Sequence, residues 1–239
     1  MVLREVIKLW KEDKRVTKRE KGIYYASEVF THPFVQWCRY HNVEPTQYRE
    51  EFYDYYMFVG DSVHKAIQEK LFKQGWTGEE EYVWQEKTFK IVGHPDLISP
   101  DKKKVLELKI VGNTTFSRIP KEQHIAQLIT YLMMTKINKG ELVYINRVNG
   151  KVKIFRYELN NFAINLFNKI LKYWHLVNKV VNIDDPVKAW EVIQRTEWAE
   201  KNKKQIVDYG YFEYWYKNVQ PYIQDYKKKK LKSVVTVKL

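Results

Sequence analysis

The sequence predicts an α/β fold in which a central mixed sheet is flanked by helices and followed by a helical C-terminal extension. Three observations predict it. Apolar residues recur at helical spacing in the first third of the chain, strand patterns dominate the centre, and helical spacing returns after Asn160. One more helical pattern lies between two of the strands, and such an order gives a mixed sheet with helices against it.

The N-terminal helices are expected near residues 2–19, 27–40 and 60–74, and Ser27 is the expected N-cap of the second. The third helix is expected to begin at the segment Gly60-Asp61-Ser62-Val63-His64. His64, Ile67 and Leu71 share one face of this helix, so His64 is expected to point inward with the apolar side.

The centre contains five segments with strand patterns, and an Asn149-Gly150 dipeptide typical of hairpin turns lies between the last two. The helix between the third and fourth strands has a buried stripe of Ile125, Leu128, Ile129 and Leu132. The predicted strands are Tyr82–Val92, Pro95–Ile98, Lys104–Ile110, Glu141–Val148 and Lys151–Glu158.

The C-terminal part is expected to be helical. Asn160 is the predicted N-cap of a long helix that ends at Asp184-Asp185-Pro186, and a short helix with Trp190, Ile193 and Trp198 follows. The stripe predicted to be buried on the long helix comprises Phe162, Leu166, Ile170, Trp174 and Val177. The chain is expected to form a single domain with an N-terminal helical region (1–59), a core (60–160), a helical extension (161–226) and a basic tail (227–239).

The chain carries a formal net charge of +13, which indicates a polyanionic partner such as nucleic acid. A lysine-rich surface of a heat-adapted protein would give the same excess, and part of the charge lies in the tail at Lys227–Lys230. No apolar stretch of about eighteen residues occurs, and the start of the chain is rich in Lys, Arg and Glu. We therefore expect no membrane association and an intracellular, cytoplasmic location, or the host cytoplasm for a viral protein.

Candidate chemistry is concentrated between Gly93 and Lys109. In the predicted strand Lys104–Ile110, Glu107 and Lys109 share one face, and a hairpin-like return would bring Asp96 beside Glu107. Two such carboxylates are hard oxygen ligands suited to Mg²⁺ or Mn²⁺, with Lys109 next to the metal-bound water. The alternative is an amphipathic strand whose charges face solvent.

Two helices carry further candidates. On the first, His64 is either a core histidine or a third metal ligand. On the second, His124, Gln127 and Tyr131 form a polar stripe beside the buried one, which indicates either groups that reach into a cleft or a solvent-facing side.

The order Gly60-x-x-x-His64, Gly93-x-Pro95-Asp96, Glu107-x-Lys109 and Gln127-x-x-x-Tyr131 resembles the RecB-type branch of the PD-(D/E)xK nucleases, and especially the CRISPR-associated Cas-four exonucleases. The four elements cover about the middle third of the chain. The resemblance implies a restriction-endonuclease-like core and a divalent-metal-dependent deoxyribonuclease, either an exonuclease or an endonuclease, that prefers single-stranded DNA. A weaker likeness extends upstream to Tyr25–Phe30 and Trp37–Tyr40.

The resemblance implies that Asp96, Glu107 and the Leu108 main-chain carbonyl bind Mn²⁺ or Mg²⁺ together with His64, whose imidazole favours Mn²⁺. Lys109 would orient the attacking water, help to deprotonate it and offset charge in the transition state. Gln127 and Tyr131 would serve the site without binding the metal, and Glu86 is a weaker candidate for support of the metal shell. The aromatic residues considered for stacking on bases are Tyr53, Tyr55, Tyr56 and Trp84.

The chain departs from the Cas-four pattern in its cysteines. Cas-four proteins usually hold an iron–sulfur cluster with four cysteines, whereas Cys38 is the single cysteine here. No cluster is therefore expected, and aromatic residues after Tyr209 are expected to replace it by packing. An alternative function is that of a nuclease-fold DNA-binding subunit that acts only within a CRISPR-adaptation, recombination or viral replication complex; a homo-oligomer is also compatible with the sequence.

Overall fold

The structure is a computed structural model that describes residues 5–9, 19–46 and 51–222, without the side chains of 51–53 and 222. Residues 5–9 are helical, whereas the rest of the first predicted helix up to residue 18, the side chain of Tyr53 and the basic tail lie outside the described residues. Among the helices described, none is long and apolar enough to cross a membrane.

The chain divides into two compact units. Of the described residues, the first unit contains 5–9, 22–29 and 51–174, and the second contains 19–21, 30–46 and 175–222. The second unit thus joins the predicted C-terminal extension to a segment of the predicted N-terminal region. The division therefore does not follow the sequential order of regions expected from the sequence.

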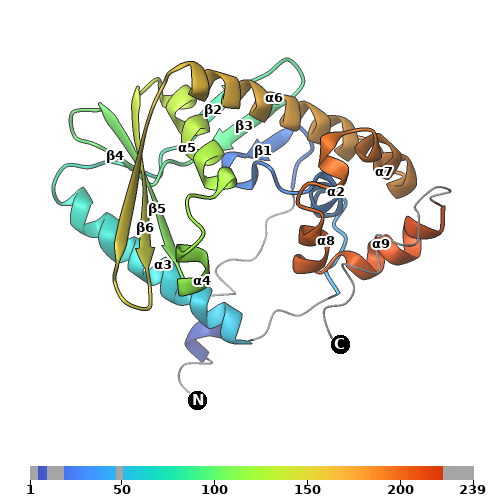
Figure 1. The fold of residues 1–239 in the computed structure, drawn as a ribbon, viewed down its shortest axis with the longest axis horizontal. Coiled ribbons are helices and arrows are strands. Elements are labelled where there is room, and N and C mark those ends of the chain that lie inside the picture. Colours follow the sequence, from blue (N-terminus) through green and yellow to red (C-terminus); the bar gives the residue numbers. More distant parts are fainter. Residues whose placement is uncertain (1–4, 10–18, 47–50, 223–239) are drawn as a thin grey trace. The chain divides into compact units, whose positions relative to one another are not determined.

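The first unit is the predicted α/β body, but its strands form two sheets (Figure 1). In the smaller sheet, β3 (Lys90–Gly93) lies between β1 (Ile23–Tyr25), to which it is parallel, and the antiparallel β2 (Tyr82–Gln85). The order of the larger sheet is β4 (Leu97–Ile98), β5 (Lys104–Val111), β6 (Lys139–Asn146) and β7 (Val152–Glu158). Its central pair, β5 and β6, is parallel, and the two outer pairs are antiparallel.

The predicted strand Tyr82–Val92 is wrong as a single strand, because the chain turns back within it. The Glu86 N–H donates to the Phe89 carbonyl at 2.9 Å, which closes the turn between β2 and β3. The other predicted strands are present with shifted ends, and β4 is reduced to two residues. The predicted hairpin between β6 and β7 is confirmed, with Gly150 at a φ of +70°.

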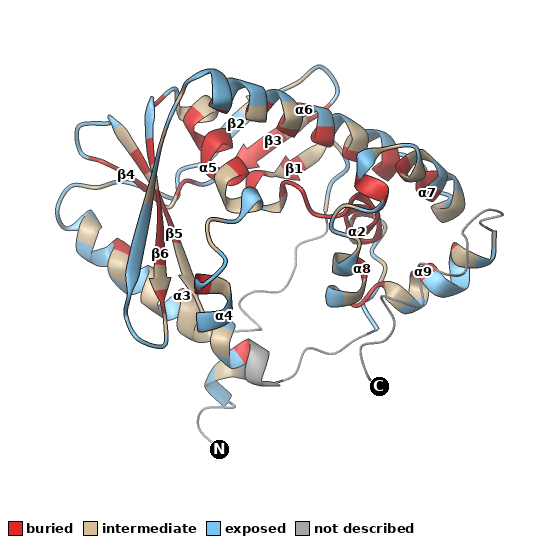
Figure 2. Cartoon of the chain, viewed as in Figure 1, coloured by how far each residue is buried: buried red, intermediate tan, exposed pale blue. Residues whose placement is uncertain are grey.

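Helices of the first unit cover both faces of the larger sheet. Helix α3 (Glu51–Phe72) supplies Ile67 and Leu71, which pack against a buried cluster that includes Leu108. Helix α5 (Glu122–Thr135) contacts β5 and β6. Because side chains alternate along β5, Glu107 and Lys109 project to the face opposite Leu108. Buried residues are concentrated in α5 and β6 (Figure 2). The short α4 (Asn113–Phe116) and the 3₁₀ turn η1 (Ala26–Glu28) complete this part.

Helix α3 begins at Glu51, not at Gly60 as predicted. A glycine inside a helix costs only about 1 kcal/mol relative to alanine, and packing outweighs such a cost. At this position α3 lies against β5, because a Cβ on Gly60 would be 3.9 Å from the Ile110 Cβ.

Helix α6 (Asn161–Val181) starts as predicted, since the Asn160 side chain accepts a hydrogen bond from the Ala163 N–H at 3.1 Å. The expectation that Phe162 is buried is wrong, because this side chain is 58% exposed. Its neighbour Ala163 continues the buried stripe instead, since adjacent helical residues point about 100° apart. Within the first unit, α6 packs on the smaller sheet through Trp174, which stacks on Tyr24 at 5.2 Å between ring centroids.

The second unit is helical and is held together by aromatic residues. Its elements are α2 (Pro33–Tyr40), α7 (Pro186–Gln194), η2 (Glu197–Ala199), α8 (Lys204–Asp208), α9 (Phe212–Asn218) and η3 (Gln220–Tyr222). The predicted N-cap Ser27 is wrong: α2 begins at Pro33, and the His32 side chain accepts from the Phe34 N–H. Phe30 adopts a left-handed φ of +60°, which separates η1 from α2.

Cys38 lies in the core of the second unit with Trp190 and Trp215. Burial raises the pKa of its thiol well above the ordinary value, so the side chain is an uncharged packing residue. Tyr211 and Trp215 are also buried in this core, which confirms the expected packing role of aromatic residues after Tyr209. The predicted break before α7 is confirmed, with the Asp185 carboxylate accepting from two backbone N–H groups.

Candidate active site

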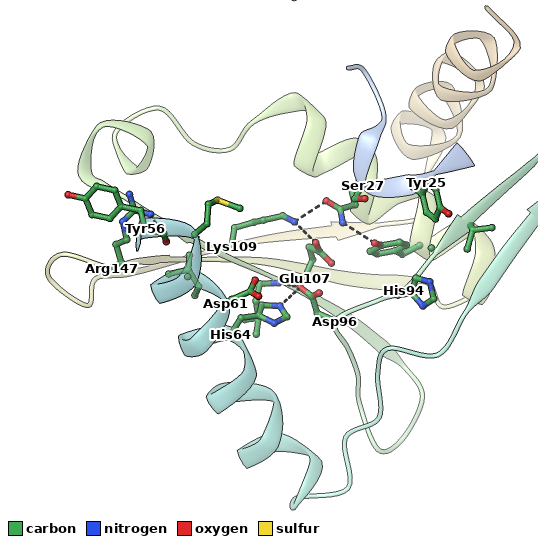
Figure 3. A pocket seen from close by; sticks show the side chains of 18 residues that line it. Tyr25, Ser27, Tyr56, Asp61, His64, His94, Asp96, Glu107, Lys109 and Arg147 are labelled. Atoms are coloured by element: carbon green, nitrogen blue, oxygen red, sulfur yellow. Dashed lines mark hydrogen bonds and ion pairs between the residues drawn. The ribbon is translucent and has the colours of Figure 1, made fainter. Parts of the chain in front are cut away.

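A cavity of about 440 Å³ lies in the first unit, lined by residues of α3, β3, β5 and α5. The predicted site residues come from separate segments of the chain, and the fold brings all of them to this cavity (Figure 3). They are His64, Asp96, Glu107, Leu108, Lys109, Gln127 and Tyr131.

Asp96 connects α3 to β5. Its Oδ2 accepts a hydrogen bond from the Leu108 N–H at 2.7 Å and lies 3.0 Å from Nε2 of His64. The hydrogen bond to Asp96 raises the pKa of His64 above its ordinary value, although burial opposes the shift. His64 therefore contacts a carboxylate at the cavity and is not enclosed in apolar core.

Glu107 projects from β5 into the interior and is 1% exposed. Its Oε1 accepts from the Lys109 ammonium at 2.5 Å, whereas its Oε2 is buried without a hydrogen-bond partner among the described residues. Burial raises the pKa of this carboxyl, and the nearby Asp96 charge raises it further. The alternative of a solvated charge on an amphipathic strand therefore does not apply to Glu107.

Lys109 is held by two acceptors, the Glu107 carboxylate and Oε1 of Gln127, which lies 3.0 Å from its Nζ. Burial lowers the pKa of Lys109, but the Glu107 and Asp96 carboxylates outweigh burial and raise it above the ordinary value. The side chain is therefore an ammonium that donates hydrogen bonds. An ammonium in this position suits stabilisation of negative charge.

Gln127 and Tyr131 extend the hydrogen-bonded chain along α5. Their i, i+4 spacing places both on one face of the helix, and Nε2 of Gln127 donates to the Tyr131 hydroxyl at 2.9 Å. Gly93 leaves space for this ring, because a Cβ there would be 2.5 Å from Cε1 of Tyr131. The glycine of the Gly-His-Pro-Asp segment thus has a steric function inside the site.

Several lining residues were not singled out by the sequence as site residues. Asp61 lies three residues before His64, and this helical spacing is a signal that would have placed it on the same face of α3. Tyr56, considered only for stacking, lines the cavity, and Arg147 lines it from the loop after β6. Arg147 has no sequence signal, since its place depends on contacts between distant segments.

Other residues considered from the sequence lie elsewhere. The ring of His124 bonds the Tyr144 hydroxyl at 2.8 Å and does not line the cavity. Glu86 accepts from the indole of Trp84 at 2.8 Å, and Trp84 packs against Phe167, so neither residue reaches the carboxylates. Tyr55 is 40% exposed but does not line the cavity.

The donor set fits a divalent cation. Among the residues that the structure describes, no three His, Cys, Asp or Glu side chains are arranged around a common metal position. The cavity nevertheless contains two neighbouring carboxylates, one of which has an unpaired buried oxygen at Glu107 Oε2. A cation beside this oxygen would offset the repulsion by which Asp96 raises the pKa of Glu107. Hard oxygen donors with one imidazole suit Mn²⁺ or Mg²⁺.

No family model matches the chain, and no curated protein matches it in sequence. Its fold is similar to that of SSO0001, with a TM-score of 0.54 and 20% identity over 72% of this chain and 86% of that one. An alkaline exonuclease from Laribacter hongkongensis gives a TM-score of 0.47 with 15% identity, over 67% of this chain and 90% of that one. A phage-related exonuclease from Haemophilus somnus gives 0.45 with 9% identity, over 65% and 92%. The similarity to SSO0001 is a similarity of fold.

Proposed function

We propose that this protein is a divalent-metal-dependent deoxyribonuclease that hydrolyses phosphodiester bonds. The observation that carries the proposal is Oε2 of Glu107, which has no hydrogen-bond partner among the described residues and is buried in a cavity beside Asp96 and a charged lysine. A buried carboxylate oxygen without a partner is costly unless a ligand completes it. The two carboxylates can bind a cation. This cation and the Lys109 ammonium would together stabilise the negative charge of a phosphate substrate.

In this proposal Asp96 and Glu107 hold Mn²⁺ or Mg²⁺ together with His64 and the Leu108 carbonyl. When bound, the ion supplies Lewis-acid stabilisation of the phosphate oxygens and acidifies a water. Lys109 orients the attacking water and stabilises the charge that develops on the phosphate. Gln127 and Tyr131 keep the Lys109 ammonium in place through hydrogen bonds that exist before substrate binds.

We infer that the substrate is DNA and that a single strand is preferred. The net charge of +13 supports a polyanionic substrate, and rings on the cavity wall such as Tyr56 can stack on unpaired bases. The resemblance to the RecB-type and Cas-four nucleases supports the same activity, as an exonuclease or an endonuclease. Whether a larger complex is required is decided by the assay of the isolated chain.

The test is cleavage of end-labelled single-stranded and duplex DNA by the purified protein with Mn²⁺, with Mg²⁺ or with chelator. Glu107→Gln preserves shape and removes the charge, and we expect its single-turnover rate to fall by at least about a thousandfold with DNA binding retained. The matched control is Glu141→Gln on the adjacent strand β6. Glu141 also pairs with a lysine, Lys104, at 3.0 Å, but it does not line the cavity.

The outcomes separate the candidate functions. Metal-dependent cleavage that is lost in Glu107→Gln and kept in Glu141→Gln supports the proposal. Binding of DNA without cleavage under every metal condition would refute an autonomous nuclease and favour a subunit of a larger complex. Equal loss in both variants would mean that the carboxylates act through stability, which the midpoint of thermal unfolding would reveal.

A further inference from the structure

Arg147 lines the cavity and has no acidic partner among the residues that the structure describes. The backbone fixes its position firmly, since its N–H donates to the Val111 carbonyl at 2.9 Å directly after the β5–β6 pairing ends. Among the described residues, no carboxylate forms an ion pair with its guanidinium, whereas Arg156 on β7 pairs with Glu141 at 3.1 Å. The Nε of Arg147 is buried and has no hydrogen-bond partner in the same set of residues.

The guanidinium is oriented by an aromatic ring. Its Cζ lies 3.9 Å from the centroid of the Tyr56 ring, and one terminal nitrogen donates a long 3.4 Å hydrogen bond to the Tyr56 carbonyl. Stacking on a ring fixes the plane of the donors and reduces the freedom that they lose on binding a ligand. The guanidinium also approaches Gly112, where a Cβ would be 3.3 Å from Nη2.

The position of Arg147 relative to the carboxylates indicates which phosphate it can reach. Lys109 pairs with Tyr144 in the β5–β6 register, and Arg147 follows three residues after Tyr144. Three residues of strand span about 10 Å. Figure 3 shows Arg147 and Tyr56 at one end of the cavity, His94 and Tyr25 at the other, and Asp96, Glu107 and Lys109 between them.

We propose that Arg147, oriented by Tyr56, binds a backbone phosphate of DNA that flanks the scissile phosphate. This inference rests on the proposed function, which it deepens by naming a substrate-binding residue. A guanidinium presents parallel N–H donors that match two phosphate oxygens, and the Nε of Arg147 has no acceptor among the described residues. The phosphate is either an internal phosphodiester or a terminal monophosphate, since both present the same oxygens.

The test uses single-stranded oligonucleotides in which one phosphate at a time is replaced by an uncharged methylphosphonate. We expect the parent protein with Mn²⁺ to lose about tenfold or more in single-turnover rate at one position beside the scissile phosphate. Arg147→Ala should lose a similar factor on unmodified DNA and nothing further at that position. Arg147→Lys retains the charge but not the paired N–H donors, so its single-turnover rate should lie between those of the parent and Arg147→Ala. Arg156→Ala is the matched control, and its cleavage rates and methylphosphonate penalties should equal those of the parent.

A second comparison distinguishes the source of the phosphate. If 5′- or 3′-terminal phosphorylation changes the parent rate and this change disappears in Arg147→Ala, the residue binds a terminal monophosphate. A methylphosphonate effect in the interior of the strand identifies a phosphodiester. A residue that only anchors α3 would lower thermal stability and would leave the methylphosphonate penalties unchanged, which would overturn the proposal.

Binding measurements keep this test independent of catalysis. With Ca²⁺ in place of Mn²⁺, fluorescence anisotropy gives the Kd of the same oligonucleotides over a range of salt concentrations. Loss of one phosphate contact should reduce the slope of log Kd against log salt by about 0.7 for a single strand. If the parent binds DNA but does not cleave it, the proposed nuclease function is refuted. The difference in salt slope between the parent and Arg147→Ala still tests the phosphate contact in that case. An unchanged slope and position-independent penalties would refute the role of Arg147.

Discussion

Replacing Gly93 by alanine should slow catalysis at the candidate site without removing any of its functional groups. The added Cβ would be 2.5 Å from Cε1 of Tyr131 and 3.2 Å from the Cβ of Ala26. Both neighbours are buried, at 3% and 0% exposure, so neither has a free direction in which to withdraw. Restoring ordinary contact requires the Tyr131 ring to move by about 1 Å.

A shift of this size would lengthen the 2.9 Å hydrogen bond between Gln127 and the Tyr131 hydroxyl beyond bonding distance. Gln127 would then lose the contact that orients its Oε1 toward Lys109. A displacement of about 1 Å in a catalytic group costs on the order of a hundredfold in rate, and overpacking of a buried position costs about 1–3 kcal/mol of stability. We expect losses of these sizes in Gly93→Ala.

The matched control is Gly60→Ala, which also adds one methyl group to the cavity lining. Its Cβ would be at ordinary contact distance, 3.9 Å from Ile110, and it lies inside α3. Alanine in a helix interior is better than glycine by about 0.5–1 kcal/mol, so this variant should be slightly more stable and remain active. Single-turnover cleavage and thermal unfolding of both variants provide the measurement. A Gly93→Ala protein with parental rate and stability would refute the steric role of Gly93.

Two other predictions concern histidines. His64→Ala should weaken Mn²⁺ binding by at least about tenfold in calorimetry and leave DNA affinity in chelator nearly unchanged, and an unaltered Mn²⁺ affinity would remove His64 from the ligand set. In the second unit, burial lowers the pKa of His32 to about 3, below its ordinary value of 6.5, so the native state binds fewer protons than the unfolded chain between these pH values. Stability should therefore decrease as the pH falls from 6.5 toward 3, by up to about 1.4 kcal/mol per pH unit. His32→Asn, which retains an acceptor for the Phe34 N–H, should flatten this slope in urea titrations, whereas a parallel slope would show that His32 does not cause it.

Strand and helix periodicity predict which candidate residues share a face, whereas their roles are implied by the resemblance to the RecB-type nucleases. Alternation along β5 puts Glu107 and Lys109 on one face, and the i, i+4 spacing on α5 does the same for Gln127 and Tyr131. Periodicity does not reveal burial, however. The same alternation was compatible with a solvent-facing Glu107, and only the packing of α5 on this face excludes it.

The features that the sequence did not predict depend on contacts between distant segments. The second unit exists because α2 packs against α7 and α8, about 150 or more residues away in the chain, and no local pattern records this pairing. Gly60 was mistaken for a helix start because a glycine is a common boundary residue, whereas in α3 packing overrides its propensity. Arg147 lies in a turn, and its side chain packs on Tyr56 of another element.

Two polar atoms of the cavity lack a hydrogen-bond partner among the described residues, and their requirements are opposite. Glu107 Oε2 is an acceptor that needs a donor or a cation, and Arg147 Nε is a donor that needs an acceptor. They cannot satisfy each other if a substrate is to enter between them, and leaving both buried and unpaired destabilises the free protein. A cation together with a phosphate-bearing chain would satisfy both at once, because the cation faces the carboxylates and the phosphate oxygens face the guanidinium. Binding of a cation and a phosphate together would therefore remove both sources of destabilisation. A ligand that carries charge of one sign would leave either Glu107 Oε2 or Arg147 Nε without a partner.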